Sequence, residues 1–129
     1  LGIHAPVGHG MPHTQNSGQA PGRRKLLVVL FVAFLAHSIE TVLYGISQFL
    51  LVQYADVGTI AGPTKFSLMA CIYHSAETHT SLGYGAFTPE GPIRMLAGIE
   101  ALNGLLLIAW TASFTYLEME RYWKAGAAR

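Results

Sequence analysis

Two long apolar blocks dominate the hydropathy pattern of this chain. Residues 26–52 contain no Lys, Arg or Asp, and residues 93–117 form a second block in which apolar residues prevail. A helix of about 20 apolar residues suffices to cross the hydrocarbon core of a bilayer. Both blocks therefore predict transmembrane helices, and the first is long enough to cross the bilayer at a tilt.

The segment between these blocks predicts a shorter, re-entrant helix. Residues 65–80 have a helical pattern but are too few to span a bilayer. A connector with Gly and Pro precedes this segment at 54–63, and an outer turn with two prolines follows it at 88–92. Irregular backbone at membrane depth requires protein or water around it, so this order of elements implies further subunits.

The two ends of the chain differ from its apolar middle. Residues 1–22 are rich in Gly, Pro, His and other polar residues and predict a flexible tail, and residues 125–129 form a short C-terminal tail. His4, His9 and His13 lie in the first tail at a spacing that fits no standard metal site. A solvated tail is therefore the preferred interpretation.

Composition and charge indicate a membrane protein rather than a soluble domain. Hydrophobic residues make up 51% of the 129 residues and charged residues only 12%, which is too apolar for a typical soluble protein. A single cysteine, Cys71, excludes an intrachain disulfide framework. Six basic residues flank the outer ends of the two spans: Arg23, Arg24, Lys25, Arg121, Lys124 and Arg129. Since only Lys65 and Arg94 lie between the spans, the positive-inside rule places both termini in the cytoplasm.

Residues 81–85, just after the predicted re-entrant helix, read Ser-Leu-Gly-Tyr-Gly. A dehydrated potassium ion requires oxygens in place of its water shell, and backbone carbonyls supply them where successive residues turn their C=O groups inward. Glycine reaches the required φ and ψ values at little cost, so Gly83 and Gly85 suit such a filter. A glycine turn between two membrane helices is the alternative interpretation.

This segment and the helix before it resemble the pore helix and selectivity filter of small two-transmembrane bacterial potassium channels. The residues that carry the resemblance are Ser75, Glu77, Thr78, Thr80, Gly83, Tyr84 and Gly85. The resemblance implies an all-α membrane protein, in which two transmembrane helices flank a re-entrant pore helix and a filter loop within a pore domain of residues 23–124. It also implies a homotetramer in the lipid bilayer of a bacterial inner membrane, with K⁺ as the transported ion, no cofactor and no other bound metal.

The resemblance further implies roles for individual residues. The residues expected to bind ions in the filter are Ser81, Leu82, Gly83, Tyr84 and Gly85. The side chains of Leu82 and Tyr84 are expected to point away from the pore and pack behind the filter, which Glu77, Thr78 and Thr80 support. Gly104 lies near the usual place of a gating hinge in the second helix, and a small residue for helix packing is an equal alternative.

Three residues depart from the usual filter of this family. Ala86 stands where an Asp often follows Gly-Tyr-Gly and bonds the pore-helix Glu, so Glu77 lacks that partner. Glu77 is then expected to be protonated, or to bond Tyr84, a backbone amide or another group. His79 replaces a small residue, and Ser81 replaces a Thr whose methyl group packs the filter. These departures leave potassium selectivity and conduction open.

Four polar residues lie inside the predicted spans, where charge is costly and usually faces a bundle interior or a cavity. They are His37, Glu40, Glu100 and Asn103. At 1.5 Å per residue, Glu40 lies about 22 Å from the inner face and Glu100 about 9 Å below the outer face. In the outer third of the bilayer the two carboxyl groups could meet and share a proton, or bond His37 or Asn103. A proton site or gating latch is one interpretation, and polar contacts between helices behind the filter are the preferred one.

Three functions are open on this evidence. The first is a tetrameric potassium-type or cation-selective channel that conducts passively. The second is an accessory subunit that keeps the channel fold without conducting, within a larger membrane complex. The third and weakest is a proton-coupled carrier, for which two spans are few. An enzyme is not expected, because no catalytic triad, zinc spacing or phosphate loop stands out, and the dispersed basic residues do not support nucleic-acid binding.

Overall fold

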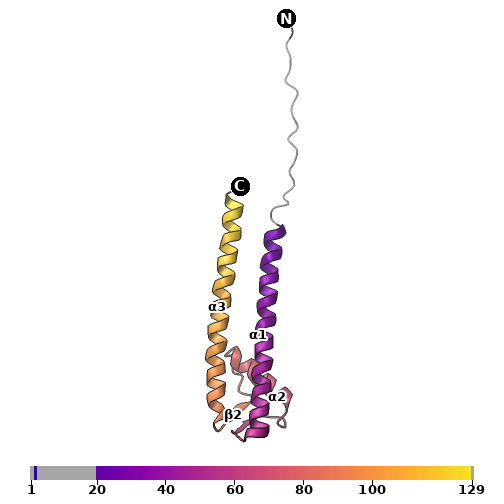
Figure 1. Cartoon of the computed structure of the whole chain (residues 1–129), viewed down its shortest axis with the longest axis vertical. Coiled ribbons are helices and arrows are strands. Elements are labelled where there is room, and N and C mark those ends of the chain that lie inside the picture. The colour runs from indigo at the N-terminus through magenta and orange to yellow at the C-terminus, as the bar shows by residue number, and fades with distance from the viewer. Residues whose placement is uncertain (1, 3–19, 129) are drawn as a thin grey trace.

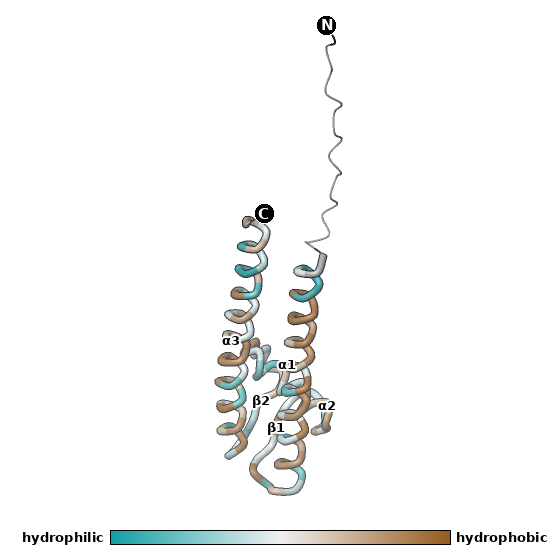
Figure 2. The backbone as a smooth tube through the Cα atoms, turned by 45° about the horizontal axis from the view of Figure 1, so that its top comes forward, coloured by the Kyte–Doolittle hydropathy of each residue, from teal (hydrophilic) through white to brown (hydrophobic). Residues whose placement is uncertain are grey.

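Two long helices, α1 (Ala20–Ala55) and α3 (Ile93–Ala127), run antiparallel and side by side (Figure 1). The structure is a computed structural model and describes residue 2 and residues 20–128. Both helices are long and apolar enough to cross a membrane, and Figure 2 shows the apolar stretch of α1 between more polar ends. The two predicted spans are therefore present, and the start of α1 lies at the same end of the molecule as the end of α3.

Helix α3 continues beyond the span predicted at 93–117. Its extension carries two exposed ion pairs, Arg121 with Glu118 at 3.3 Å and Lys124 with Glu120 at 2.8 Å. Pairs at this spacing each stabilise a helix by about 0.2–0.5 kcal/mol. The sequence predicts a tail from residue 125, but the helix runs through Ala127, because helix-forming polar residues continue it after the apolar block ends.

Helix α1 likewise begins before the span predicted at 26–52. It starts at Ala20, so the last residues of the tail predicted at 1–22 are helical. Residues 1 and 3–19 of that tail, with its three histidines, lie outside the described residues.

The short helix α2 (Leu68–His79) packs against both long helices at the end of the molecule away from the chain termini (Figure 1). It starts later than the predicted 65–80 because Ser67 caps it: the Ser67 hydroxyl accepts a hydrogen bond from Ala70 N at 3.2 Å, which is the usual N-cap contact. Its position between the two spans, at one end of them, is the one expected of a re-entrant helix.

Two short strands close the loops on either side of α2. Strand β1 (Thr59–Ala61) pairs antiparallel with β2 (Thr88–Glu90), with Ile60 opposite Pro89. The N–H of Ile93 also donates to the carbonyl of Val57 at 2.9 Å. The sequence predicts only a connector and a turn here, because three-residue strands are too short to show an alternating pattern. The pairing joins the entry to α2 with the exit from the turn that follows it.

Helix α2 approaches both long helices closely at glycine. A Cβ atom added to Gly45 of α1 would lie 2.7 Å from Ile72 Cα, and one added to Gly104 of α3 would lie 2.1 Å from the His79 carbonyl oxygen. Small residues at membrane-helix contacts let backbones approach in this way. This contact fits the packing interpretation of Gly104, and its role as a gating hinge stays a prediction.

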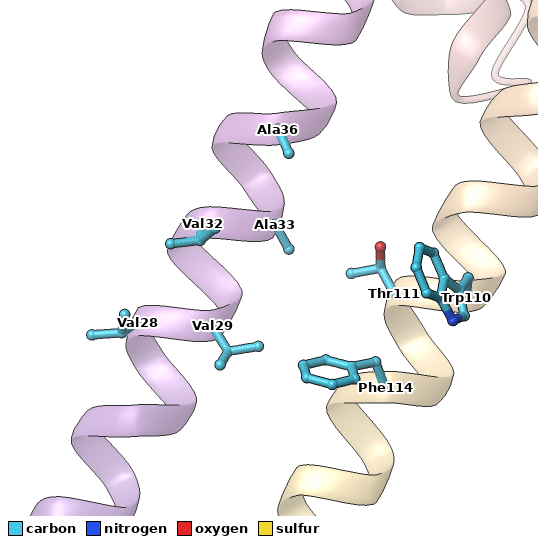
Figure 3. A pocket seen from close by; sticks show the side chains of 8 residues that line it. All are labelled: Val28, Val29, Val32, Ala33, Ala36, Trp110, Thr111 and Phe114. Carbon is cyan, nitrogen blue, oxygen red and sulfur yellow. The ribbon is translucent and has the colours of Figure 1, made fainter.

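Helices α1 and α3 leave a groove between them over part of their length. An apolar groove of about 380 Å³ lies between them, and in Figure 3 Val29 and Phe114 point toward one another across it. Thr111 lines the same groove. Beyond the groove, nearer the chain termini, the two helices meet again, because a Cβ atom added to Gly22 would lie 2.3 Å from the Tyr122 ring.

Gly104→Ala is expected to lower the stability of the fold by about 1–3 kcal/mol, the usual cost of overpacking a tight contact. The added methyl group meets the backbone of His79, so α2 or α3 must shift. Thermal unfolding of the purified protein in detergent measures the change. Gly98→Ala is the matched control, since a Cβ atom there meets nothing within 4 Å. Equal stability of the two variants would contradict the close contact.

Candidate functional site

A tight turn follows α2 and folds back on its last residues. The N–H of Ser81 donates to the carbonyl of Thr78 at 3.0 Å, and the N–H groups of Leu82 and Gly83 donate to the carbonyl of Glu77 at 3.0 and 3.4 Å. These bonds satisfy carbonyl groups that a helix end otherwise leaves without partners. The turn therefore fixes the next residues at the C-terminal end of α2, where the helix dipole is negative.

The backbone of this segment alternates between left-handed and other conformations. Ser81, Gly83 and Gly85 have φ values of 56°, 58° and 76°, whereas Leu82 and Tyr84 do not have positive φ. Left-handed backbone costs little for glycine and about 1–2 kcal/mol for other residues, so Ser81 carries local strain. Such alternation lets successive carbonyl groups face one side of the chain, as a ring of ion-coordinating carbonyls requires.

The side chains of this segment are exposed in the single chain. The side chains of Leu82 and Tyr84 are 58% and 72% exposed, although the resemblance implies that they pack behind a filter. A Cβ atom at Gly83 or Gly85 would meet nothing within 4 Å. One chain therefore builds the shape of this segment but supplies no surroundings for it, and exposed irregular backbone of this kind does not occur against lipid.

Behind the turn, a buried polar network joins all three helices. Glu100 of α3 accepts a hydrogen bond from Gln48 Nε2 of α1 at 2.5 Å and also contacts the Ser75 hydroxyl of α2. His74 Nδ1 lies 3.0 Å from Gln48 Oε1. All four side chains are at least 97% buried. Polar contacts of this kind are strong in a low-dielectric interior when every group is satisfied, so the network holds α2 in place.

The two contacts of the Ser75 hydroxyl can both be hydrogen bonds when the Glu100 carboxyl group carries a proton. The Ser75 hydroxyl lies 2.7 Å from the carbonyl oxygen of Thr41 and also contacts Glu100 Oε1. A hydroxyl has one hydrogen to donate, and the Thr41 carbonyl only accepts. If Ser75 donates to Thr41, the contact with Glu100 is a hydrogen bond only when the carboxyl group carries its own proton.

A second polar cluster lies at the end of α2. Asn103 Nδ2 donates to Glu40 Oε1 and lies 3.4 Å from the Tyr44 hydroxyl. His37 Nε2 is 3.0 Å from Thr111 Oγ1, and its Nδ1 is 3.4 Å from Nε2 of His79. The four intramembrane residues predicted as one cluster do not all bond to one another. Glu40 bonds to Asn103, whereas Glu100 bonds to Gln48 and to Ser75 of α2. His37 contacts Thr111 and His79.

The three predicted support residues occupy different environments. Glu77 is 5% exposed, and its Oε1 has no hydrogen-bond partner among the described residues. Thr78 Oγ1 donates to the His74 carbonyl at 2.8 Å, and Thr80 Oγ1 donates to the Ala76 carbonyl at 2.7 Å. Within one chain, the backbone carbonyl of Glu77 holds the turn, and its side chain interacts with Tyr73.

Gln48 and His74 have no place in the sequence-based prediction, although both belong to the network at Glu100. Glu40, Tyr44 and Gln48 follow each other at intervals of four residues on α1, so they share one face of the helix. A row of polar residues in an apolar span usually faces the protein interior. This spacing therefore places Gln48 on the same face of α1 as Glu40.

A family model described as "Ion channel" matches residues 25–119, which is well over half of the chain and includes both apolar helices, α2 and the turn. No curated protein and no solved structure matches the chain.

Glu100→Gln is expected to retain most of the stability, whereas Glu100→Ala should lose it. A glutamine amide can donate to Ser75 and accept from Gln48, as a protonated carboxyl group does. Alanine leaves those two buried groups without this partner, at about 1–3 kcal/mol each. Thermal unfolding in detergent measures both variants. A glutamine variant as unstable as the alanine variant would contradict a proton on Glu100.

Proposed function

The chain belongs to the ion channel family whose model it matches, and we propose that it forms the pore of a potassium-selective channel as a homotetramer. The alternating left-handed backbone of Ser81, Gly83 and Gly85 carries this proposal. It lies between two membrane helices, at the negative end of α2, where the helix dipole favours a cation. The residues proposed to coordinate K⁺ are those of the turn: Ser81, Leu82, Gly83, Tyr84 and Gly85.

The need for several copies follows from coordination. Filters of the potassium type surround the ion with carbonyls from four loops, and one loop supplies only a quarter of each ring. The exposed Leu82 and Tyr84 side chains and the open space beside both glycines leave room for neighbouring copies. Closed rotational symmetry is the usual way in which identical chains enclose one axis.

The distribution of basic residues supports an orientation. Arg23, Arg24 and Lys25 lie at the start of α1, and Arg121 and Lys124 lie near the end of α3. By the positive-inside rule this end of the hairpin faces the cytoplasm. The filter turn lies toward the opposite end and would therefore open toward the outer side.

Purified protein in lipid vesicles is expected to pass K⁺ in preference to Na⁺, with block by Ba²⁺. Gly83→Ala should reduce this flux to the level of empty vesicles. A φ of 58° strains any residue with a Cβ atom, and the substitution would introduce this strain in every subunit of the pore. Gly98→Ala is the control, since that glycine lies in α3 and its added Cβ atom meets nothing within 4 Å.

Wild-type flux equal to that of empty vesicles would overturn the channel proposal. Equal Na⁺ and K⁺ flux would overturn selectivity and retain only a cation pore. If the chain conducts nothing and purifies as single copies within another complex, the accessory-subunit function replaces the channel. In that case the alanine at position 86, together with the lack of a partner for Glu77 Oε1 among the described residues, would mark the loss of the usual filter clamp.

A further inference from the structure

We propose that His37, Glu40 and His79 bind a divalent transition metal ion, for which Zn²⁺ has the appropriate ligand preference. The site lies outside the turn proposed to conduct K⁺, between α1 and the last residue of α2. It would connect these two helices whether or not the pore conducts. Its ligand atoms, one from each side chain, all lie within 4.8 Å of one another.

The distance between the two histidines is the main geometric argument. His37 Nδ1 and His79 Nε2 are 3.4 Å apart, at the long end of hydrogen-bond distances. Two nitrogens that bind one tetrahedral Zn²⁺ at 2.0–2.1 Å lie about 3.3–3.4 Å apart. The imidazole pair is therefore spaced as two ligands of one metal, and the Glu40 carboxylate is the third ligand group of the cluster.

The groups around the cluster orient two of the three ligands. His37 uses its other ring nitrogen to contact Thr111 Oγ1 at 3.0 Å, and Glu40 accepts a hydrogen bond from Asn103. Metal-binding histidines and carboxylates commonly have such outer partners, which fix the tautomer and the direction of the ligand atom. His79 is 2% exposed, and its Nδ1 has no hydrogen-bond partner among the described residues, so no described group directs its Nε2 lone pair away from the cluster.

The donor set selects the class of ion. Two imidazole nitrogens and one carboxylate suit Zn²⁺ and neighbouring transition metals, whereas Mg²⁺ and Ca²⁺ prefer oxygen ligands. Three protein ligands leave a fourth position, and a groove of about 510 Å³ lined by His37, Thr41, His79 and Thr80, among others, opens beside the cluster. A water molecule or another ligand has room there.

Metal binding would connect α1 to the point where the filter turn begins. His79 is the last residue of α2, and its carbonyl oxygen lies in the close contact with Gly104 of α3. Two residues later the chain adopts the left-handed conformation at Ser81. A metal held by His79 would therefore restrain the end of α2 that positions the turn, although no bound metal besides K⁺ is expected from the sequence.

The test measures Zn²⁺ binding to the purified protein in detergent, after chelator treatment, by isothermal titration calorimetry and by elemental analysis. The N-terminal histidines are removed first, in the background variant His4→Gln, His9→Gln, His13→Gln, so that binding by this segment does not interfere. We expect one Zn²⁺ per chain in this background. His79→Gln and Glu40→Gln should each weaken binding at least tenfold, and Thr111→Val about tenfold, as expected for an outer partner.

Two further measurements keep the outcome independent of folding defects and of conduction. Co²⁺ bound to the background protein should give the intense visible absorption of a tetrahedral site, and Zn²⁺ should raise its thermal unfolding temperature, because a ligand that binds only the folded state stabilises it. No stoichiometric Zn²⁺ binding in the background, binding unchanged by both His79→Gln and Glu40→Gln, or a weak octahedral Co²⁺ spectrum would each overturn the site. Since none of these readouts uses ion flux, failure of the channel proposal would be recognised separately.

Discussion

Backbone N–H and C=O groups at membrane depth must find partners in protein or in water, because hydrocarbon offers none. The long helices meet this requirement within themselves, but the turn after α2 does not. Its start is tied to the Glu77 and Thr78 carbonyls, and beyond Gly83 the single chain leaves it open. The proposed assembly and conduction follow from this open segment, since a water-filled axis surrounded by further copies would give it suitable surroundings.

Two sets of contacts hold α2 in place between the long helices. Glycine lets the short helix touch the backbones of α1 and α3, and the buried network at Glu100 joins all three helices with hydrogen bonds. Hydrogen bonds of this kind are electrostatically stronger in a low-dielectric interior than in water. The turn is strained at Ser81, and strained backbone persists only where its surroundings over-determine it. The contacts that hold α2 in place therefore also allow the strained turn after it to persist.

The architecture could be predicted from sequence because the bilayer itself sets the rules. Its thickness fixes the length of apolar blocks, so both spans and a short helix between them are predicted. Gly83 and Gly85 mark two of the three left-handed positions in residues 81–85, but Ser81 is left-handed as well. The helix ends and the two short strands were missed, since no apolar pattern defines them. Side-chain pairing was only partly accessible: Glu40 and Asn103 meet, but nothing in the sequence tells that Glu100 bonds Gln48 rather than a residue of the other pair.

The most direct test of this account is a structure of the purified protein in lipid and potassium chloride, determined by electron cryomicroscopy without imposed symmetry. The account predicts four copies around one axis, with the carbonyl groups of residues 81–85 facing that axis and ion density between them. A particle in which those carbonyl groups face lipid or a different protein, with no other copy opposite them, would contradict it.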